Sequence, residues 1–364
     1  MLTMSLASLG WGATFEAAYR RFDRRGNRPG RIARVDRGVC TVLTATGTVR
    51  ASLAGRMLGL IAKDPLAMPC VGDWAAIRHW DDDRYTIEAI LPRRSAIVRL
   101  TAGKAAEGQA IAANADTVAV VESLDPDPDP GRIERLMALA HESGARPLLV
   151  LTKADTVADV DLLVADLTTA APPGTEVVAV SSHTGAGLDR LREYVTEGRT
   201  LALIGASGAG KSTLVNTVVG VDVMATRQLR ADGRGRHTTS YRAMIPIPGG
   251  GVILDTPGLR AVGLFDRRPG DSATPADGLA KAFDDLEQLA ASCRFTDCHH
   301  ETEPDCAVLA AVELGTLTVR RLDNWRKLQR EQSRERARVT ARTKQGRKLL
   351  AAHGHHRRSR NTWE

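Results

Sequence analysis

Short apolar runs recur through the middle of the chain, and a loop of glycine, small or polar residues follows each of them. The runs occupy residues 117–121, 147–151, 176–180, 201–204 and 253–255. Continuous apolar runs of this length are typical of parallel strands that are buried on both faces. Apolar residues at helical spacing lie between the first two runs, over residues 133–141. The pattern therefore predicts an α/β domain with an open, mainly parallel sheet.

The region before this domain has a different pattern. Five short strand-like segments separated by turns lie at residues 31–35, 39–44, 48–53, 74–77 and 85–91. Five strands in so short a stretch predict a small closed barrel of the OB-fold type. Such barrels often bind RNA, but the arginines of this region are equally consistent with a solvated rim; they are Arg31, Arg34, Arg37, Arg50 and Arg56.

These patterns divide the chain into five parts. We expect a polar N-terminal extension with little pattern (1–29), the barrel (30–94), the α/β domain (95–268), a cysteine-containing module (269–325) and a basic C-terminal helix or tail (326–364). A helix is predicted over residues 309–328. The tail would lie along RNA phosphates or remain a solvated segment.

Composition limits the class of protein. The chain has 364 residues, of which 43% are hydrophobic and 26% charged, as in soluble proteins of two or three domains. No apolar stretch approaches the roughly 18 residues that a membrane helix needs. The first residues lack the basic start of a signal peptide. We therefore expect a cytoplasmic protein without a membrane partner.

The run at 201–204 leads into a phosphate-binding loop. The segment fits G-x-x-x-x-G-K-[ST], with helix-forming residues after it, and comprises Gly205, Ala206, Ser207, Gly208, Ala209, Gly210, Lys211, Ser212 and Thr213. Glycines let the backbone N–H groups wrap the phosphates at a helix N-terminus. Lys211 would reach the β- and γ-phosphates, and the Ser212 hydroxyl would bind Mg²⁺. The motif alone does not specify the nucleotide.

Two earlier loops indicate guanine. The run at 147–151 ends in Thr152, Lys153, Ala154 and Asp155, a T-K-x-D motif at the edge where open α/β sheets bind ligands. Asp155 would accept two hydrogen bonds from the base, and the Lys153 stem would pack along it. The run at 176–180 leads into Ser181 and Ser182, in a loop of small residues whose backbone would approach the guanine carbonyl.

Two later segments resemble the switches of a nucleotide-hydrolysing enzyme. The basic segment 233–239 carries Thr238 and Thr239, of which Thr239 is the preferred Mg²⁺ ligand. The run at 253–255 ends in D-x-x-G, where Asp255 would hold the Mg²⁺ shell and the Gly258 amide would sense the γ-phosphate.

Three of the five cysteines cluster near the end of the chain. The spacing C-x4-C-x-H-x5-C brings together Cys293, Cys298, His300 and Cys306, which would close a tetrahedral structural zinc site. His299 adjoins His300 and is an alternative ligand. Cys40 and Cys70 lie singly in the barrel and are expected in its core.

The order of these motifs is informative. In most GTPases the phosphate loop comes first, whereas here T-K-A-D and the serine loop precede it and D-T-P-G follows it. The chain therefore looks like a circularly permuted GTPase. With a barrel before it and a Cys/His cluster after it, the chain resembles the ribosome small-subunit-dependent GTPase A family.

This resemblance implies a factor of late ribosome assembly. Such a protein binds the small ribosomal subunit and its rRNA with GTP bound, hydrolyses GTP there and leaves, and docking on an asymmetric particle favours a monomer. Leu259 stands where many GTPases carry a water-orienting glutamine, so slow turnover is expected without the subunit. The resemblance makes His237 the candidate that positions the water, and it favours His300 over His299 as zinc ligand.

Two other functions are compatible with parts of the sequence. A P-loop ATPase or small-molecule kinase needs the phosphate loop but not Asp155, and ATP would then compete with GTP. An RNA-binding protein with a vestigial nucleotide site would not retain Lys211, Ser212 and Asp255 together.

Overall fold

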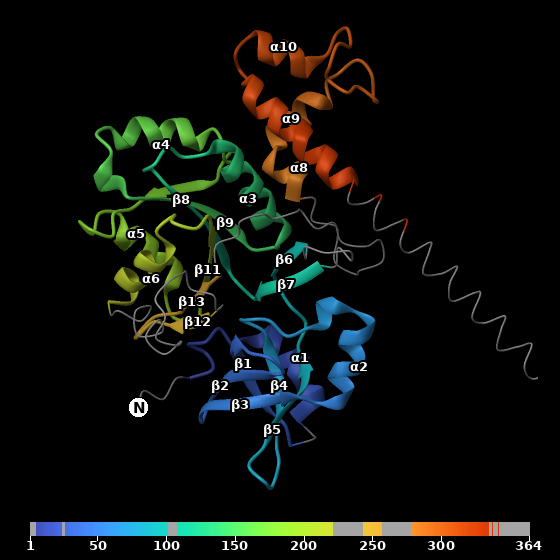
Figure 1. Cartoon of the computed structure of the whole chain (residues 1–364), viewed down its shortest axis with the longest axis vertical. Coiled ribbons are helices and arrows are strands. Elements are labelled where there is room, and N and C mark those ends of the chain that lie inside the picture. Colours follow the sequence, from blue (N-terminus) through green and yellow to red (C-terminus); the bar gives the residue numbers. More distant parts are fainter. Residues whose placement is uncertain are drawn as a thin grey trace, which may run out of the picture.

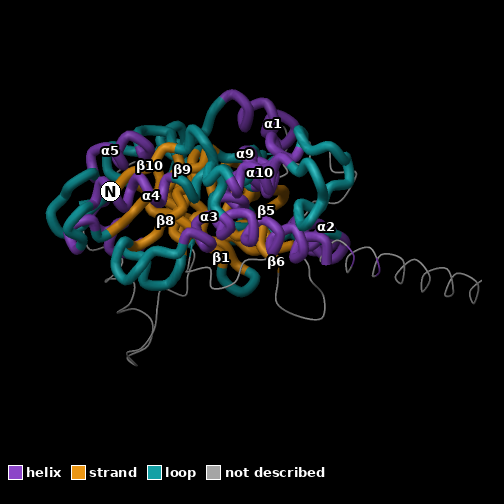
Figure 2. The backbone as a smooth tube through the Cα atoms, turned by 90° about the horizontal axis from the view of Figure 1, so that it is seen from above, coloured by secondary structure: helices purple, strands orange, loops and turns teal. Residues whose placement is uncertain are grey.

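The computed structural model describes residues 5–23, 26–100, 108–220, 243–256 and 278–334, together with residues 337 and 341. A barrel lies at one end, an α/β sheet with its helices in the middle, and a helical module beyond the sheet (Figure 1). Seen at right angles, the strands lie in the interior with helices around them (Figure 2). Among these residues, no helix has the length and apolar character needed to cross a membrane.

The predicted five-stranded barrel is confirmed. Its strands close in the order β1-β2-β3-β5-β4, with β3 and β5 parallel and the other pairs antiparallel. They are β1 (Arg28–Val35), β2 (Val39–Thr44), β3 (Gly47–Leu53), β4 (Trp74–His79) and β5 (Tyr85–Ile90). Alternate side chains point inward, because successive residues of a strand face opposite sides. This interior contains Cys40, as expected, whereas Cys70 is buried outside the barrel core in a cluster with Ala110 and Ala113.

Helix α1 (Ala13–Asp23) occupies the extension in which we expected little pattern. Its buried residues Phe15, Tyr19 and Phe22 follow helical spacing and lie on one face. The Phe15 ring packs 5.8 Å from the ring of Trp74 in β4, measured between centroids. The extension thus covers the barrel. A second helix, α2 (Gly55–Lys63), and a 3-10 turn, η1 (Pro65–Ala67), connect β3 to β4.

Arg31 joins the barrel to the sheet and is not part of a solvated rim. Its side chain is buried and donates hydrogen bonds to the Thr200 hydroxyl at 2.8 Å and to the Asn114 and Gly72 carbonyls at 3.0 and 3.2 Å. Burial lowers its pKa to about 10. The rim prediction was therefore wrong for Arg31, because the carbonyls around it replace water. The other four arginines of the predicted rim are exposed.

The hairpin of β6 (Ala96–Leu100) and β7 (Gly108–Ala113) leads into the central sheet. The sheet order is β10-β9-β8-β11-β13-β12, parallel except for β12 at the edge. Its strands are β8 (Thr117–Ser123), β9 (Arg146–Thr152), β10 (Glu176–Ala179), β11 (Thr200–Gly205), β12 (Ala243–Pro246) and β13 (Val252–Asp255). The five predicted runs all form strands of this sheet.

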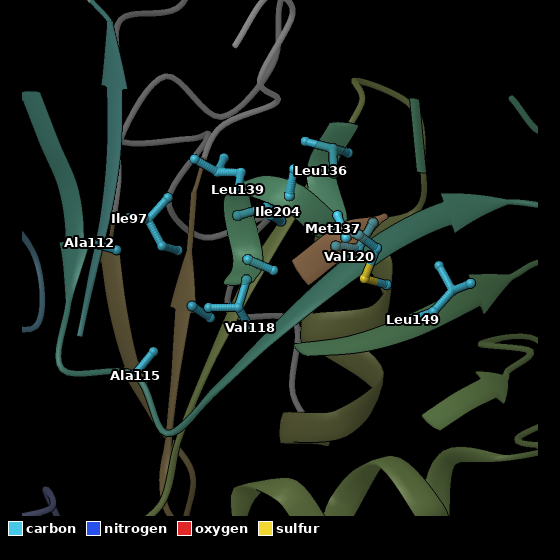
Figure 3. Packing of buried hydrophobic residues seen from close by; sticks show 14 of the residues in the cluster. Ile97, Ala112, Ala115, Val118, Val120, Leu136, Met137, Leu139, Leu149 and Ile204 are labelled. Atoms are coloured by element: carbon cyan, nitrogen blue, oxygen red, sulfur yellow. The ribbon is translucent and has the colours of Figure 1, made fainter. Parts of the chain in front are cut away.

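Helices cover both faces of the sheet, as the continuous apolar runs predicted. On one face, α3 (Pro130–Glu142) and α4 (Val160–Thr168) pack through residues such as Met137 and Leu167. On the other face lie α5 (Leu188–Arg192), the 3-10 turn η3 (Glu193–Val195) and α6 (Lys211–Val219). Figure 3 shows Leu136, Met137 and Leu139 of α3 beside strand residues of the first face.

The C-terminal module is helical. It contains α8 (Gly278–Ala282), α9 (Asp284–Ala290), α10 (Ala307–Glu313) and a further helix over residues 319–334. The prediction of one helix over 309–328 was wrong, because the chain turns at Gly315, whose φ of +74° is a left-handed conformation that glycine adopts without strain. The module packs on α3, where a Cβ on Gly278 would lie 2.3 Å from the Ala138 carbonyl oxygen.

Candidate functional site

Five parallel strands end at one edge of the sheet, and the predicted nucleotide loops follow four of them. Thr152 ends β9, Gly205 ends β11 and Asp255 ends β13, while Ser181 lies just after β10. The carboxyl ends of parallel strands lie at the same edge, which is where open α/β sheets bind ligands. Motifs scattered over more than a hundred residues of sequence are therefore brought together.

The phosphate loop runs from β11 to α6 with glycines where no side chain fits. A Cβ on Gly205 would lie 2.3 Å from the Val121 carbonyl oxygen of β8. Gly210 is the N-cap of α6 and has φ +80°, a conformation strained for other residues. The first amides of α6 are thus presented at the sheet edge, where an anion would be bound.

Lys211 folds back over this loop. Its ammonium group donates hydrogen bonds to the carbonyl oxygens of Gly205 at 2.9 Å and Ala206 at 2.6 Å. Burial lowers the pKa of Lys211, and the negative charges of Asp255 and Glu122 oppose this shift. The lysine and the Asp255 carboxylate therefore share one buried environment at the ends of β11 and β13.

Thr152 connects the T-K-A-D loop to the phosphate loop. Its buried hydroxyl lies 2.9 Å from the Ala209 carbonyl oxygen and 3.3 Å from that of Glu122. Lys153 follows in a left-handed conformation with φ +58°, and its ammonium group donates to the Asp125 carbonyl. The two loops predicted to hold the base and the phosphates are thus parts of one hydrogen-bonded structure.

Asp155 is paired with the serine loop. The buried Ser181 hydroxyl donates to Asp155 Oδ1 at 2.5 Å and accepts hydrogen bonds from the amides of His183 at 3.2 Å and Thr184 at 3.0 Å. The Ser181 hydrogen bond is the main cause that lowers the pKa of Asp155. The carboxylate is exposed, so it is held in place and accessible to a ligand.

Some of the remaining predicted residues lie in these loops, and others lie outside the described residues. Ala154 donates its amide to the Val180 carbonyl at 3.1 Å, and Ser212 and Thr213 lie in the first turn of α6. The predictions for His237, Thr238, Thr239, Gly258 and Leu259 lie outside the described residues.

One residue of the site was missed by sequence reasoning. Glu122 is buried at the end of β8 and pairs with Arg132 in the first turn of α3. The available signal was a charged residue near the end of an otherwise apolar run, since such a residue is almost never buried without a partner.

The Cys/His cluster forms a separate candidate metal centre. Ligand atoms of Cys293, Cys298, His300 and Cys306 all lie within 4.8 Å of one another. The Sγ atoms of Cys293 and Cys306 are 3.8 Å apart, and His300 Nδ1 is 3.5 and 3.3 Å from them. Metal–sulfur bonds of about 2.3 Å at tetrahedral angles give separations of this size. The set is therefore consistent with a structural metal.

The structure also distinguishes the two adjacent histidines. His300 is buried in the cluster with φ +58°, whereas His299 is exposed. The backbone turn at His300 thus brings its ring to the cysteines. The alternative ligand His299 is not part of the cluster.

Comparison with known proteins defines the family. Residues 90–265 match the RsgA GTPase family. A small ribosomal subunit biogenesis GTPase RsgA of Streptomyces avermitilis is 49% identical over 341 residues, which cover 93% of this chain and 88% of that protein. The chain belongs to the RsgA GTPase family. As a member of this family it is a GTP-hydrolysing enzyme, as the motifs predicted.

Solved structures support the same fold. YjeQ of Thermotoga maritima matches with a TM-score of 0.58 and 24% identity, over 84% of this chain and 98% of that one. YloQ, described as a circularly permuted GTPase, matches with a TM-score of 0.55 and 22% identity, over 85% and 96% of the two chains. The predicted fold, a permuted GTPase domain between a barrel and a Cys/His module, is confirmed for this RsgA-family chain.

Proposed function

We propose that this RsgA-family GTPase acts in the biogenesis of the small ribosomal subunit, the role named for its Streptomyces avermitilis relative. The main structural support for nucleotide binding is the hydrogen bond from Thr152 to the Ala209 carbonyl. It joins a guanine-type motif to a phosphate loop that lies 57 residues away. One continuous surface at the sheet edge thus offers base and phosphate recognition together.

The base would be held by the T-K-A-D and serine loops. Asp155 accepts hydrogen bonds from the N1 and N2 hydrogens of guanine, while Ser181 keeps its carboxylate in place. The Lys153 stem packs along the base, and Ser182 lies in the loop that approaches the guanine carbonyl. ATP lacks the two donors that Asp155 requires, so the site prefers GTP.

The phosphates would lie on the amides of the loop that ends at Gly210, with Lys211 released from its carbonyl partners to bind them. Ser212, Thr239 and Asp255 are the residues that would hold Mg²⁺, which neutralises charge on the phosphates. The family resemblance makes His237 the candidate that positions water, since an apolar Leu259 cannot orient it. On this assignment, hydrolysis by the isolated chain would be slow and binding of the small subunit would accelerate it.

The metal of the Cys/His centre would be zinc. Three thiolates and one imidazole form a closed tetrahedral set with no open position, which is typical of a structural site. Zinc bound there stabilises a module whose short helices α9 and α10 bury few apolar residues.

The partner would be the small ribosomal subunit and its rRNA. OB-type barrels bind RNA through exposed strands and loops, and here the exposed arginines Arg34, Arg37, Arg50 and Arg56 lie on the barrel. This role places the chain in the cytoplasm as a monomer docked on one particle.

Cosedimentation with purified subunits tests this role. With a non-hydrolysable GTP analogue, the chain should pellet with small subunits and not with large ones, and GDP should release it. Equal pelleting with both subunits, or no effect of the nucleotide, would contradict the proposal. Nucleotide competition excludes a kinase or ATPase if GTP, but not ATP, displaces a labelled GTP analogue from the chain.

A further inference from the structure

Glu122 is a carboxylate in the interior of the sheet domain. It is the residue before the last in β8, and 1% of its surface is exposed. Burying an ionised carboxylate is costly unless it is paired and hydrogen-bonded. The hydrogen-bond partners of the Glu122 carboxylate therefore indicate its structural role.

The Glu122 carboxylate binds the start of α3. It accepts hydrogen bonds from two nitrogens of the Arg132 guanidinium, one of them 3.0 Å from Oε2, and from the Asp129 amide at 3.3 Å. Asp129 is the N-cap of α3, and its own carboxylate accepts from the Arg132 amide at 3.1 Å. Hydrogen bonding to Glu122 is the main cause that raises the pKa of Arg132. Glu122 thus fixes the point where the loop 124–129 ends.

The other end of this loop reaches the nucleotide site. The Leu124 amide donates to the Thr152 carbonyl at 3.0 Å, and the Ser123 hydroxyl donates to the Asp125 carbonyl at 2.5 Å. The same Asp125 carbonyl accepts the ammonium group of Lys153. Lys153 has a positive φ, a conformation that persists only where its surroundings hold it.

We propose that Glu122 is a positioning residue of the GTPase: it anchors the loop 124–129 so that the Asp125 carbonyl holds Lys153 in place to pack along the base. The inference deepens the proposed function and rests on its nucleotide site. Packing of the lysine stem is common to all purines, whereas the choice of guanine belongs to Asp155 and Ser181. Loss of Glu122 therefore weakens binding without changing which purine is chosen.

The test uses the full chain and a fluorescent GDP derivative, displaced by GDP or by inosine diphosphate, which lacks the exocyclic amino group of guanine. Glu122→Gln keeps the size of the side chain and removes its charge. We expect about a tenfold increase in the Kd of both nucleotides, an equal increase in KM for GTP and an unchanged kcat, as the loss of charge-assisted hydrogen bonds requires.

Two further variants separate the positioning of Lys153 from the effects of losing a paired carboxylate or its charge. Glu176→Gln is the matched control, because Glu176 is also paired with two arginines, Arg146 and Arg190, but lies at the amino end of β10. It should leave Kd unchanged. Burial lowers the pKa of Lys211, and the negative charge of Glu122 also opposes this shift. Arg132→Lys keeps the charge of Glu122 and loses only the two-point contact between Arg132 and Glu122. It should raise Kd by a smaller factor than Glu122→Gln.

The outcomes separate failure of the Glu122 positioning role from failure of the proposed nucleotide site. If Glu122→Gln binds both nucleotides like Glu176→Gln, or changes the preference for GDP over inosine diphosphate, the positioning role is refuted. If this variant does not fold, Arg132→Lys decides by the same measurement. An unmodified chain that fails to bind GDP would overturn the proposed function and the inference together, whereas tight binding with no effect of either variant overturns the inference alone.

Discussion

The Thr152 hydroxyl offers a sharp test of the link between the two nucleotide loops. Thr152→Val keeps the shape of the side chain and removes the hydrogen-bond donor. Thr152 is 3% exposed, so water cannot replace the hydroxyl at the Ala209 carbonyl, 2.9 Å away, or at the Glu122 carbonyl. A lost hydrogen bond costs about 1 kcal/mol, and a buried group left without a partner adds about 1 kcal/mol or more. We expect the free energy of unfolding to fall by about 2 kcal/mol.

The same change should weaken nucleotide binding. Without the link, the phosphate loop and the base loop adopt their joint geometry for a smaller fraction of the time, and the apparent affinity falls with that fraction. A cost of about 1.4 kcal/mol corresponds to a tenfold increase in the Kd for GDP. Urea unfolding and titration with a fluorescent GDP derivative measure the two effects.

Two variants serve as controls for Thr152→Val. Thr152→Ser retains the hydroxyl and should recover most of the GDP affinity. Thr168→Val removes an exposed hydroxyl that donates to the Val164 carbonyl at 2.6 Å in α4, and it should change stability by less than about 0.5 kcal/mol. If Thr152→Val binds GDP as tightly as the unmodified chain, the link does not organise the site and the reasoning is wrong.

Three further outcomes are expected. Removing metal with a chelator should unfold the C-terminal module first, seen as loss of its helical circular dichroism, because zinc contributes on the order of 10 kcal/mol to such modules. Arg321→Met removes the 3.1 Å hydrogen bond to the buried Glu134, which keeps Arg320 and Asn324 as donors, and the two-point contact with Asp285. It should lower the free energy of unfolding in urea by about 2 kcal/mol. The lowered pKa of Asp155 means that its stabilisation is present above the ordinary aspartate pKa of about 4 and is lost as the pH falls through the lower folded value. Ser181→Ala removes the main cause of this shift, so it should be less stable than the unmodified chain at neutral pH, and part of this difference should disappear as the pH falls below about 4.

Much of the candidate nucleotide site was predictable because the constraints on its loops are local. Gly205 and Gly210 are required by backbone geometry within one loop, and the apolar run before them specifies a buried strand. The loops proposed to bind guanine follow β9 and β10 and lie at the same sheet edge, because the parallel strands all end there. These parts need no knowledge of distant contacts.

Other features depend on contacts between distant residues. Arg31 was expected in solvent, yet carbonyls from separate segments surround it, which no local pattern encodes. The partners of Glu122 were likewise not visible, because its role depends on the way α3 folds back over β8. Two misses had a local signal: the spacing of Phe15, Tyr19 and Phe22 is helical, and Gly315 marks the end of α10.

The proposed role in small-subunit biogenesis is tested by measuring GTP turnover by the purified chain, alone and with added small or large ribosomal subunits. We expect slow hydrolysis by the chain alone, strong stimulation by small subunits, none by large subunits, and no turnover of ATP. Equal rates in every mixture would contradict the proposed role in biogenesis of the small subunit.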